Sequence, residues 1–117
     1  MNDKKTTEEI ERALRYNKGK LKWSLVDWKY LEPMVRVLEM GAEKYAPYNW
    51  KKGMPITEVS ESLLRHMFSF LNGEDIDSES KVNHLGHVMV NAMFLLYILD
   101  QKPEYDDRYN KQENDTR

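Results

Sequence analysis

Cysteine is absent from the sequence, and its absence excludes disulfide bonds and thiolate metal sites. His, Asp and Glu are therefore the strong side-chain metal ligands that the chain can offer. Glycine and proline are scarce, with 5 and 4 residues, too few for an all-β chain rich in tight turns. Because no run of about 18 apolar residues occurs, we also expect no membrane-spanning helix. These absences favour a helical protein.

The sequence also lacks a surplus of positive charge. Its 18 Lys and Arg residues face 20 Asp and Glu residues, which gives a net charge of -2. Long nucleic acid is therefore not an expected partner, and an anion site would have to be local. The first eleven residues are charged where a signal peptide needs an apolar core, and 117 residues suffice for one compact core. We expect a single intracellular domain over residues 1–117.

Four helices are predicted from the spacing of apolar residues and from capping signals. The expected helices run from Thr6 to Tyr16, from Pro33 to Lys44, from Thr57 to Asn72, and from the acidic segment 74–80 to Asp100. The remaining segments are an N-terminal arm over 1–14, a basic loop over 15–23, an aromatic loop over 48–55 and a polar tail over 101–117. Thr6 and Glu9 form a capping box for the first helix, Thr57 caps the third, and the acidic segment favours the N-terminus of the fourth.

The fourth predicted helix carries apolar residues around most of its circumference, so we expect it to be the central element. A four-helix monomer of this size cannot bury so much apolar surface, which predicts a homo-oligomer, either a dimer or a tetramer. The predicted fold class is a small, oligomeric all-α bundle.

Three histidines, the only ones in the chain, fall within 22 residues. On a helix, His84, His87 and Asn91 form one polar stripe, and His66 on the preceding helix can face it. Three interpretations remain open. The imidazoles are satisfied core or subunit-interface residues, they bind a divalent metal together with carboxylates, or they join Arg65 in holding a phosphate.

Aromatic and basic residues gather in the two predicted loops and at the end of the second helix. The set comprises Lys18, Lys20, Lys22, Trp23, Lys44, Tyr45, Tyr48, Asn49, Trp50, Lys51 and Lys52. Aromatic faces stack on purines, Lys contacts phosphate, and Asn can read a base edge. In the alternative interpretation the aromatics cover core edges and the lysines are solvated. P-loop, Rossmann, zincin and hydrolase-elbow motifs are missing, so no catalytic residue is predicted.

Residues 15–108 resemble a small phage-encoded family named after the N-terminal domain of dATP/dGTP diphosphohydrolases. The resemblance lies in Gly19-Lys20, residues 39–45, Asn49 to Gly53, Leu63 to His66, Gly73 to Asp77, and His84 to His87 with Asn91. It implies a phage protein that acts in the cytoplasm of an infected bacterium.

The two helices that carry the histidines also resemble MazG-type all-α nucleotide pyrophosphohydrolases. The family's ExxD motif followed by Asn corresponds to His84, His87 and Asn91, and its ExxE motif corresponds to Glu58 and Glu61. Magnesium prefers oxygen ligands, so the resemblance implies a pocket that holds a nucleotide without cleaving it and needs no cofactor. An analogy to phage sponges that sequester the cyclic dinucleotides of CBASS immunity points the same way.

We therefore expect a protein that binds a purine nucleotide and sequesters a cyclic dinucleotide signal without hydrolysing it. The expected ligand contacts are Lys18, Lys20, Lys44, Tyr45, Asn49, Trp50, Lys51, Arg65, His66, His84, His87 and Asn91. The rival is a dATP/dGTP diphosphohydrolase that releases pyrophosphate. Its Mg²⁺ or Mn²⁺ would be held among Glu58, Glu61, His66, Glu74, Asp75, His84 and His87. A third alternative is a helical module in which the histidines only join subunits.

Overall fold

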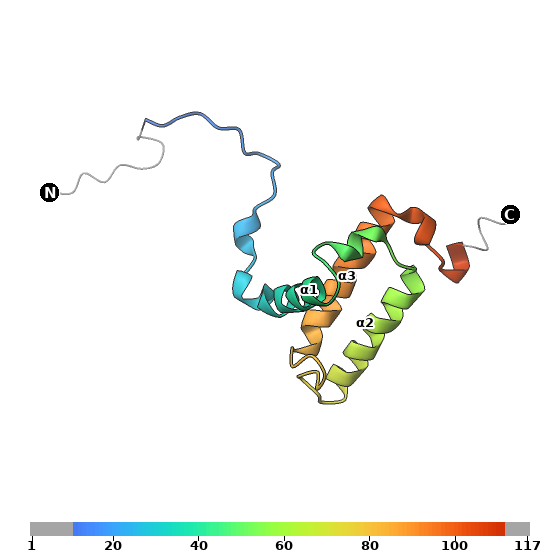
Figure 1. Ribbon diagram of the computed structural model, residues 1–117. Helices are drawn as coiled ribbons and strands as arrows, with labels where there is room; N and C mark the ends of the chain where they lie inside the picture. The colour runs from blue at the N-terminus through green and yellow to red at the C-terminus, as the bar shows by residue number, and fades with distance from the viewer. Residues whose placement is uncertain (1–10, 112–117) are drawn as a thin grey trace.

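The computed structural model describes residues 11–111, and the regular elements in this range are helices joined by loops (Figure 1). The elements are η1 (Trp23–Leu25), η2 (Trp28–Leu31), α1 (Glu32–Lys44), η3 (Asn49–Lys52), α2 (Ile56–Leu71), α3 (His84–Gln101) and η4 (Pro103–Tyr105), where η marks a 3₁₀ helix. An isolated antiparallel bridge between Ile76 and Asn83 is the one β feature of this range. The predicted all-α class and small-bundle architecture are confirmed.

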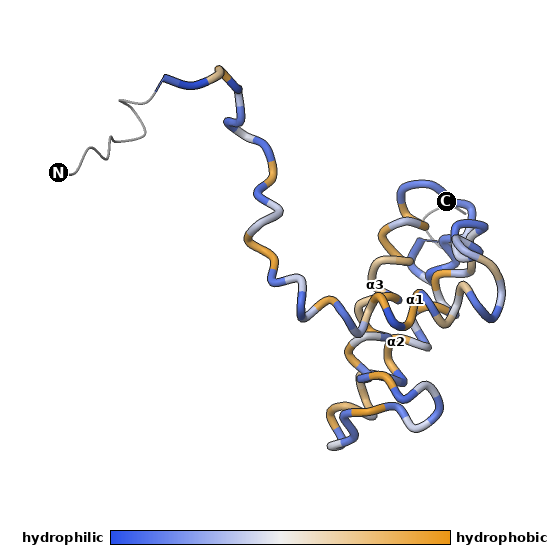
Figure 2. Tube along the Cα trace, turned by 60° about the vertical axis from the view of Figure 1, so that its left-hand side comes forward, coloured by the Kyte–Doolittle hydropathy of each residue, from blue (hydrophilic) through white to orange (hydrophobic). Residues whose placement is uncertain are grey.

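Helix α3 is central, as its composition predicts, because it packs against both α1 and α2. Helices α2 and α3 form an antiparallel hairpin, and apolar segments meet where the three helices approach one another (Figure 2). Ile56, Val59 and Ile98 form a buried cluster at one end of this hairpin, and Val90 is buried further along α3. No helix within residues 11–111 is long and apolar enough to cross a membrane.

A close approach of α1 to α3 occurs at Gly86. A Cβ atom at this position would lie 2.8 Å from the backbone carbon, the carbonyl oxygen and the Cβ of Pro33. Only a residue without a side chain lets the start of α1 lie directly on α3. This contact fixes the helix that forms one wall of the cavity described below.

The N-terminal arm differs from the prediction. Residues 11–16 are not helical, and together with residues 17–30 they form the segment that leads away from the helical body and is called the arm from here on. The expected capping residues Thr6 and Glu9 lie outside the described residues. A single short helix without tertiary contacts is marginal in water, which explains the difference. The basic loop is confirmed, with a turn at Gly19, whose φ is +81°.

The starts of α2 and α3 also differ from the prediction. Pro55 precedes α2 as its N-cap, and Thr57 lies inside the helix, where its backbone N–H and its hydroxyl donate to Asp107 at 2.9 and 2.6 Å. Helix α3 begins only at His84, after Asn83, whose side chain accepts from the N–H of Leu85. The acidic segment therefore forms no helix start, because its backbone pairs across the loop.

Residues 101–111 of the predicted polar tail are more ordered than expected, and the rest of the tail lies outside the described residues. Tyr105 of η4 packs against the buried cluster, and Asp107 holds the start of α2. Asp106 accepts two hydrogen bonds from Arg108, at 2.8 and 2.7 Å. Local polar partners thus order residues whose composition alone predicts fraying.

Candidate functional site

A cavity of about 490 Å³ lies between α1, η3 and α3, a size typical of small-molecule sites. Its walls are mainly apolar, with Leu38 and Ala42 from α1 and Val90 and Phe94 from α3. The lining also includes aromatic residues of the loop after α1 and a few polar residues of α2 and α3. The functional residues of the lining are Glu39, Tyr45, Tyr48, Asn49, Trp50, Ser62, His87 and Asn91.

The aromatic side of the cavity is anchored through Trp50. Its ring stacks on Phe94 at a centroid distance of 5.1 Å and meets Tyr97 edge-on at 5.1 Å. The hydroxyl of Tyr97 also donates to the carbonyl of Lys51 at 3.0 Å, so η3 is fixed to α3. Trp50 is consequently a packing residue as well as a wall of the cavity.

Two tyrosines beside this anchor remain largely exposed, Tyr45 at 65% and Tyr48 at 67%. Tyr48 adopts a left-handed conformation with φ 62° and ψ 17°, which residues other than Gly, Asn and Asp rarely occupy. Backbone strain of this kind gathers at functional sites. It turns the chain sharply between α1 and η3.

Lysines surround the aromatic side. The Nζ of Lys44 lies 5.3 Å from the ring centre of Tyr45, and the Nζ of Lys51 lies 4.6 Å from that of Tyr48. These are cation–π distances, so the rim of the cavity is positive. Within residues 11–111, no Lys or Arg lines the cavity itself, and Glu39 is its one carboxylate.

The polar edge consists of Ser62, His87 and Asn91. The amide of Asn91 donates to the hydroxyl of Ser62 at 3.2 Å, and Asn91 is only 9% exposed. His87 approaches the Ser80 hydroxyl through its Nε2 at 2.7 Å. Polar hydrogen-bonding groups therefore face an otherwise apolar cavity.

The imidazole of His87 forms one cluster with those of His66 and His84. The ring of His66 stacks parallel to that of His87, with centroids 4.0 Å apart and planes 3° apart. The Nδ1 atoms of His66 and His84 are 2.8 Å apart, and His84 Nε2 lies 2.6 Å from an oxygen of Glu74. The predicted juxtaposition of His66 with the α3 stripe is thus present in the structure.

Burial keeps part of this cluster neutral. The pKa of His66 lies below its usual value because of burial and the neighbouring His87, and burial also lowers the pKa of His87 against the opposing charge of Asp77. At Asp77, burial favours the protonated carboxyl group and raises the pKa, but hydrogen bonds from Ser80 outweigh this effect and hold the pKa below its usual value. His66 and His87 are therefore neutral near pH 7 and lie near an ionised Asp77.

The structure brings many predicted ligand residues together. Tyr45, Asn49, Trp50, His87 and Asn91 line the cavity, Lys44 and Lys51 border it, and His66 and His84 lie behind His87.

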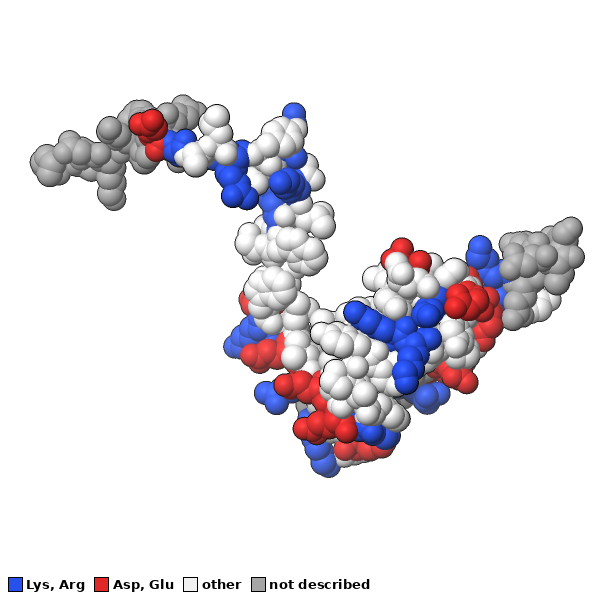
Figure 3. Space-filling view, turned by 45° about the horizontal axis from the view of Figure 1, so that its top comes forward, with Lys and Arg blue, Asp and Glu red and all other residues white. Residues whose placement is uncertain are grey.

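Other predicted residues lie elsewhere. Lys18 and Lys20 belong to the arm, where basic side chains gather away from the body (Figure 3). Arg65, Glu58 and Glu61 are exposed on α2 and do not line the cavity. Asp75 contributes its backbone carbonyl, which accepts from the N–H of His84 at 2.9 Å.

Sequence reasoning assigned no role to Ser62, Ser80 or Asp77 individually. For Ser80 and Asp77 the sequence does contain a local signal, because Asp side chains often accept a hydrogen bond from a backbone N–H a few residues later and so form a turn. In the structure the Ser80 N–H donates to Asp77 in this way at 2.9 Å. Ser62 gives no such signal, because only the packing of α2 on α3 places it beside Asn91.

The comparison with known families matches this chain over residues 11–108 to the family described as "dATP/dGTP diphosphohydrolase, N-terminal". The chain belongs to this family. A curated relative, "dATP/dGTP diphosphohydrolase" of Salmonella phage PMBT28, is 32% identical over 96 residues, which cover 82% of this chain and 33% of the relative. The chain thus spans about a third of the relative's length. No solved structure matches the chain.

Proposed function

We propose that this chain is a purine nucleotide-binding domain. The observation that carries the proposal is the cavity itself, in which Tyr45, Tyr48 and Asn49 share one space with His87 and Asn91. Two groups of residues that are 38 to 46 positions apart in sequence thereby line one site. The name of the phage relative, which refers to two purine nucleotides, supports the same ligand class.

The aromatic end suits the base. The exposed rings of Tyr45 and Tyr48 can stack on a purine, which contributes about 1–3 kcal/mol per base, and the lysines that cover them are displaceable. Asn49, beside them, has the donor and acceptor pair that reads an adenine edge.

The phosphates are assigned to the positive rim and to His87. Lys44 and Lys51 lie over the tyrosine rings of the aromatic end, and both have flexible side chains that can turn toward an anion. We assign no phosphate contact to Lys18, Lys20 or Arg65, because these exposed side chains do not line the cavity and, unlike Lys44 and Lys51, are not placed over the tyrosines that line it.

The finer proposal is that the nucleotide is held intact. Glu39 is the single carboxylate of the lining, whereas Glu58 and Glu61, which correspond to magnesium ligands of MazG-type enzymes, are exposed outside it. Paired oxygens that would hold Mg²⁺ on a bound triphosphate are therefore missing from the cavity wall within residues 11–111. A cyclic dinucleotide has two bases, whereas each chain offers one aromatic wall. Two copies of the chain would therefore bind one cyclic dinucleotide between them.

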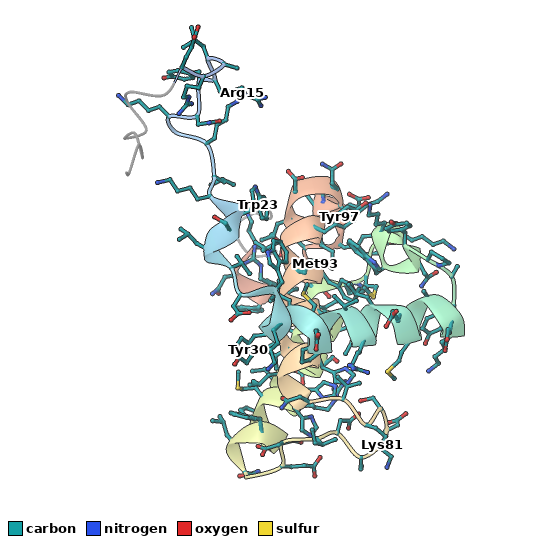
Figure 4. All side chains as sticks on the ribbon, turned by 90° about the vertical axis from the view of Figure 1, so that its left-hand side faces the viewer. Arg15, Trp23, Tyr30, Lys81, Met93 and Tyr97 are labelled. Atoms are coloured by element: carbon teal, nitrogen blue, oxygen red, sulfur yellow. The ribbon has the colours of Figure 1, made fainter. Side chains whose placement is uncertain are left out.

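A homo-oligomer is part of this proposal. The exposed fractions of Leu21, Trp23, Leu25, Trp28 and Tyr30 on the arm are between 58 and 83%. The arm projects from the body, with Trp23 and Tyr30 on it (Figure 4), and the radius of gyration is 20.9 Å against about 13 Å for a compact chain of this length. A second copy that receives this arm would bury an apolar surface too large for a monomer.

Calorimetry with dATP, dGTP and dCTP tests nucleotide binding. We expect micromolar binding of the purine nucleotides and a loss of roughly 5- to 150-fold in affinity for Tyr48→Asn, in which Asn tolerates the left-handed backbone but cannot stack. Lys18→Gln, which removes a charge from the arm, is the control and should bind like the parent. The proposal would be overturned if no purine nucleotide, linear or cyclic, bound to the protein in this assay.

Separate measurements test whether the nucleotide stays intact and whether the chain forms a homo-oligomer. Mass spectrometry of the recovered ligand should show an intact nucleotide, and a cyclic dinucleotide should bind with one ligand per two chains. Light scattering should give a multiple of 14.0 kDa that falls to one chain for Trp23→Ser with Leu25→Ser. A parent that is monomeric at micromolar concentration would refute the assembly.

A second candidate function is hydrolysis of dATP or dGTP to the monophosphate and pyrophosphate. It is favoured by the nitrogen and oxygen donors of His66, His84 and Asp77, which lie directly behind His87. Pyrophosphate release with Mg²⁺, Mn²⁺, Co²⁺ or Zn²⁺ would establish this function and exclude retention.

A further inference from the structure

The histidine cluster contains a set of potential metal ligands from three segments. His66 lies in α2, Asp77 in the connecting loop and His84 at the first position of α3, and each offers one donor atom within 4.8 Å of the others. His84 is only 3% exposed, and the other two are half-buried. The hairpin and its loop therefore gather these donors on one spot.

The orientation of His84 leaves a lone pair pointing at this spot. Its Nε2 lies 2.6 Å from Glu74 Oε1, and an ionised carboxylate only accepts hydrogen bonds, so Nε2 carries the proton. In the neutral ring, Nδ1 is then unprotonated and lies 2.8 Å from Nδ1 of His66. A carboxylate that fixes the far nitrogen of an imidazole is the usual second layer of a histidine metal site.

Between the two Nδ1 atoms there must be a proton or a cation, because two lone pairs at this distance repel. Two nitrogens 2.8 Å apart that each lie about 2.05 Å from one ion subtend an angle of about 86°. This is close to the right angle between neighbouring ligands of an octahedron. The distance is therefore one that a single ion can accept with little movement.

Asp77 supplies the third donor in its ionised form. Its Oδ2 accepts from the Ser80 N–H at 2.9 Å, which holds the carboxylate in place beside the imidazoles. His87 is excluded from the set, because its Nε2 contacts the Ser80 hydroxyl at 2.7 Å and its distance to Asp77 is 3.8 Å. His87 instead separates the set from the cavity by stacking on His66.

We infer that His66, His84 and Asp77 form a binding site for one divalent transition-metal ion, with Glu74 as the residue that orients His84. Two imidazoles and one carboxylate favour zinc, iron, cobalt or manganese over Mg²⁺, which prefers oxygen ligands. The three protein donors leave coordination positions for water. The inference stands on this geometry alone and does not need a nucleotide.

The test is metal binding by the full chain, freed of metal with a chelator and studied without nucleotide. Titration with Co²⁺, followed by its visible absorption and by displacement with Zn²⁺, should give one site per chain with a micromolar or lower dissociation constant. His84→Gln and Asp77→Asn should each abolish the band, and Glu74→Gln should weaken binding by roughly 10- to 100-fold.

The control variants separate this set from the alternatives. Glu58→Gln and Glu61→Gln on α2, which change the two residues that correspond to MazG-type metal ligands, should bind within about threefold of the parent. Circular dichroism checks that every variant is folded, and a rise in the melting temperature of the parent with Zn²⁺ provides a second measurement. The inference is wrong if the parent binds no ion below about 100 µM, or if Glu58→Gln or Glu61→Gln loses as much affinity as His84→Gln.

Discussion

Replacing Gly86 by Ala tests the contact that positions α1 against α3. The added Cβ would lie 2.8 Å from three atoms of Pro33, two of which belong to the backbone and cannot rotate away. Overpacking of this kind costs typically 1–3 kcal/mol. In a helix, Ala is favoured over Gly by about 1 kcal/mol, so the net loss in the free energy of unfolding should be about 0–2 kcal/mol.

Gly41→Ala is the matched control. Gly41 is also helical, in α1, but no atom lies within 4 Å of the position its Cβ would take. This substitution should stabilise by about 1 kcal/mol through helix propensity alone. The difference between the two variants, about 1–3 kcal/mol, then measures the clash with Pro33 and corresponds to several degrees in melting temperature.

Urea unfolding followed by circular dichroism gives both free energies. If the Gly86→Ala variant equals or exceeds Gly41→Ala in stability, the close packing of α1 on α3 is not as described. Because α1 forms a wall of the cavity, Gly86→Ala should also weaken nucleotide binding.

Three further predictions concern the ends of the helices. Gly53→Ala should lower the stability measured in thermal unfolding by about 1–3 kcal/mol or more, because φ is +97° and the new Cβ would lie 2.5 Å from the ring of Tyr105. Gly73→Ala is the control for backbone strain alone, because Gly73 has nearly the same φ of +98° but no atom within 4 Å of the new Cβ. Asn83→Ala should cost about 1 kcal/mol in urea unfolding because Leu85 N–H loses its cap, and Asn17→Ala should be neutral. Hydrogen bonds from Thr57 hold the pKa of Asp107 below its usual 3.8, so its stabilisation is present above that pH and is lost as the pH falls through the lower, folded-state value. Asp107→Asn should therefore reduce the loss in free energy of unfolding that the parent shows between pH 7 and pH 2. An unchanged pH dependence in this variant would contradict the role of Asp107 at the start of α2.

Periodicity and capping signals predicted α1 and the central place of α3, because both helices are shaped by apolar contacts that repeat along the chain. They misplaced the start of α3, because the hydrogen bonds from Asp77 N–H to Val82 and from His84 N–H to Asp75 are set by how the loop folds back. The extended arm was likewise unpredictable, since Thr6 and Glu9 resemble a helix start whether or not a helix has partners.

The candidate site was half predictable. The stripe of His84, His87 and Asn91 follows from helical spacing, and His66 follows from an antiparallel hairpin. Nothing in the sequence shows that Tyr48 adopts a left-handed backbone or that Trp50 docks on Phe94, yet these features bring the aromatic loop to His87. Such long-range placement depends on packing and becomes visible only in three dimensions.

The packing of Trp50 gives the protein a built-in optical reporter. Trp23 and Trp28 are mostly solvated, whereas the indole of Trp50 is held between Phe94 and Tyr97 at the cavity wall. With both arm tryptophans changed to Phe, all remaining indole fluorescence would arise from that wall, and its quenching would record each occupancy of the cavity directly.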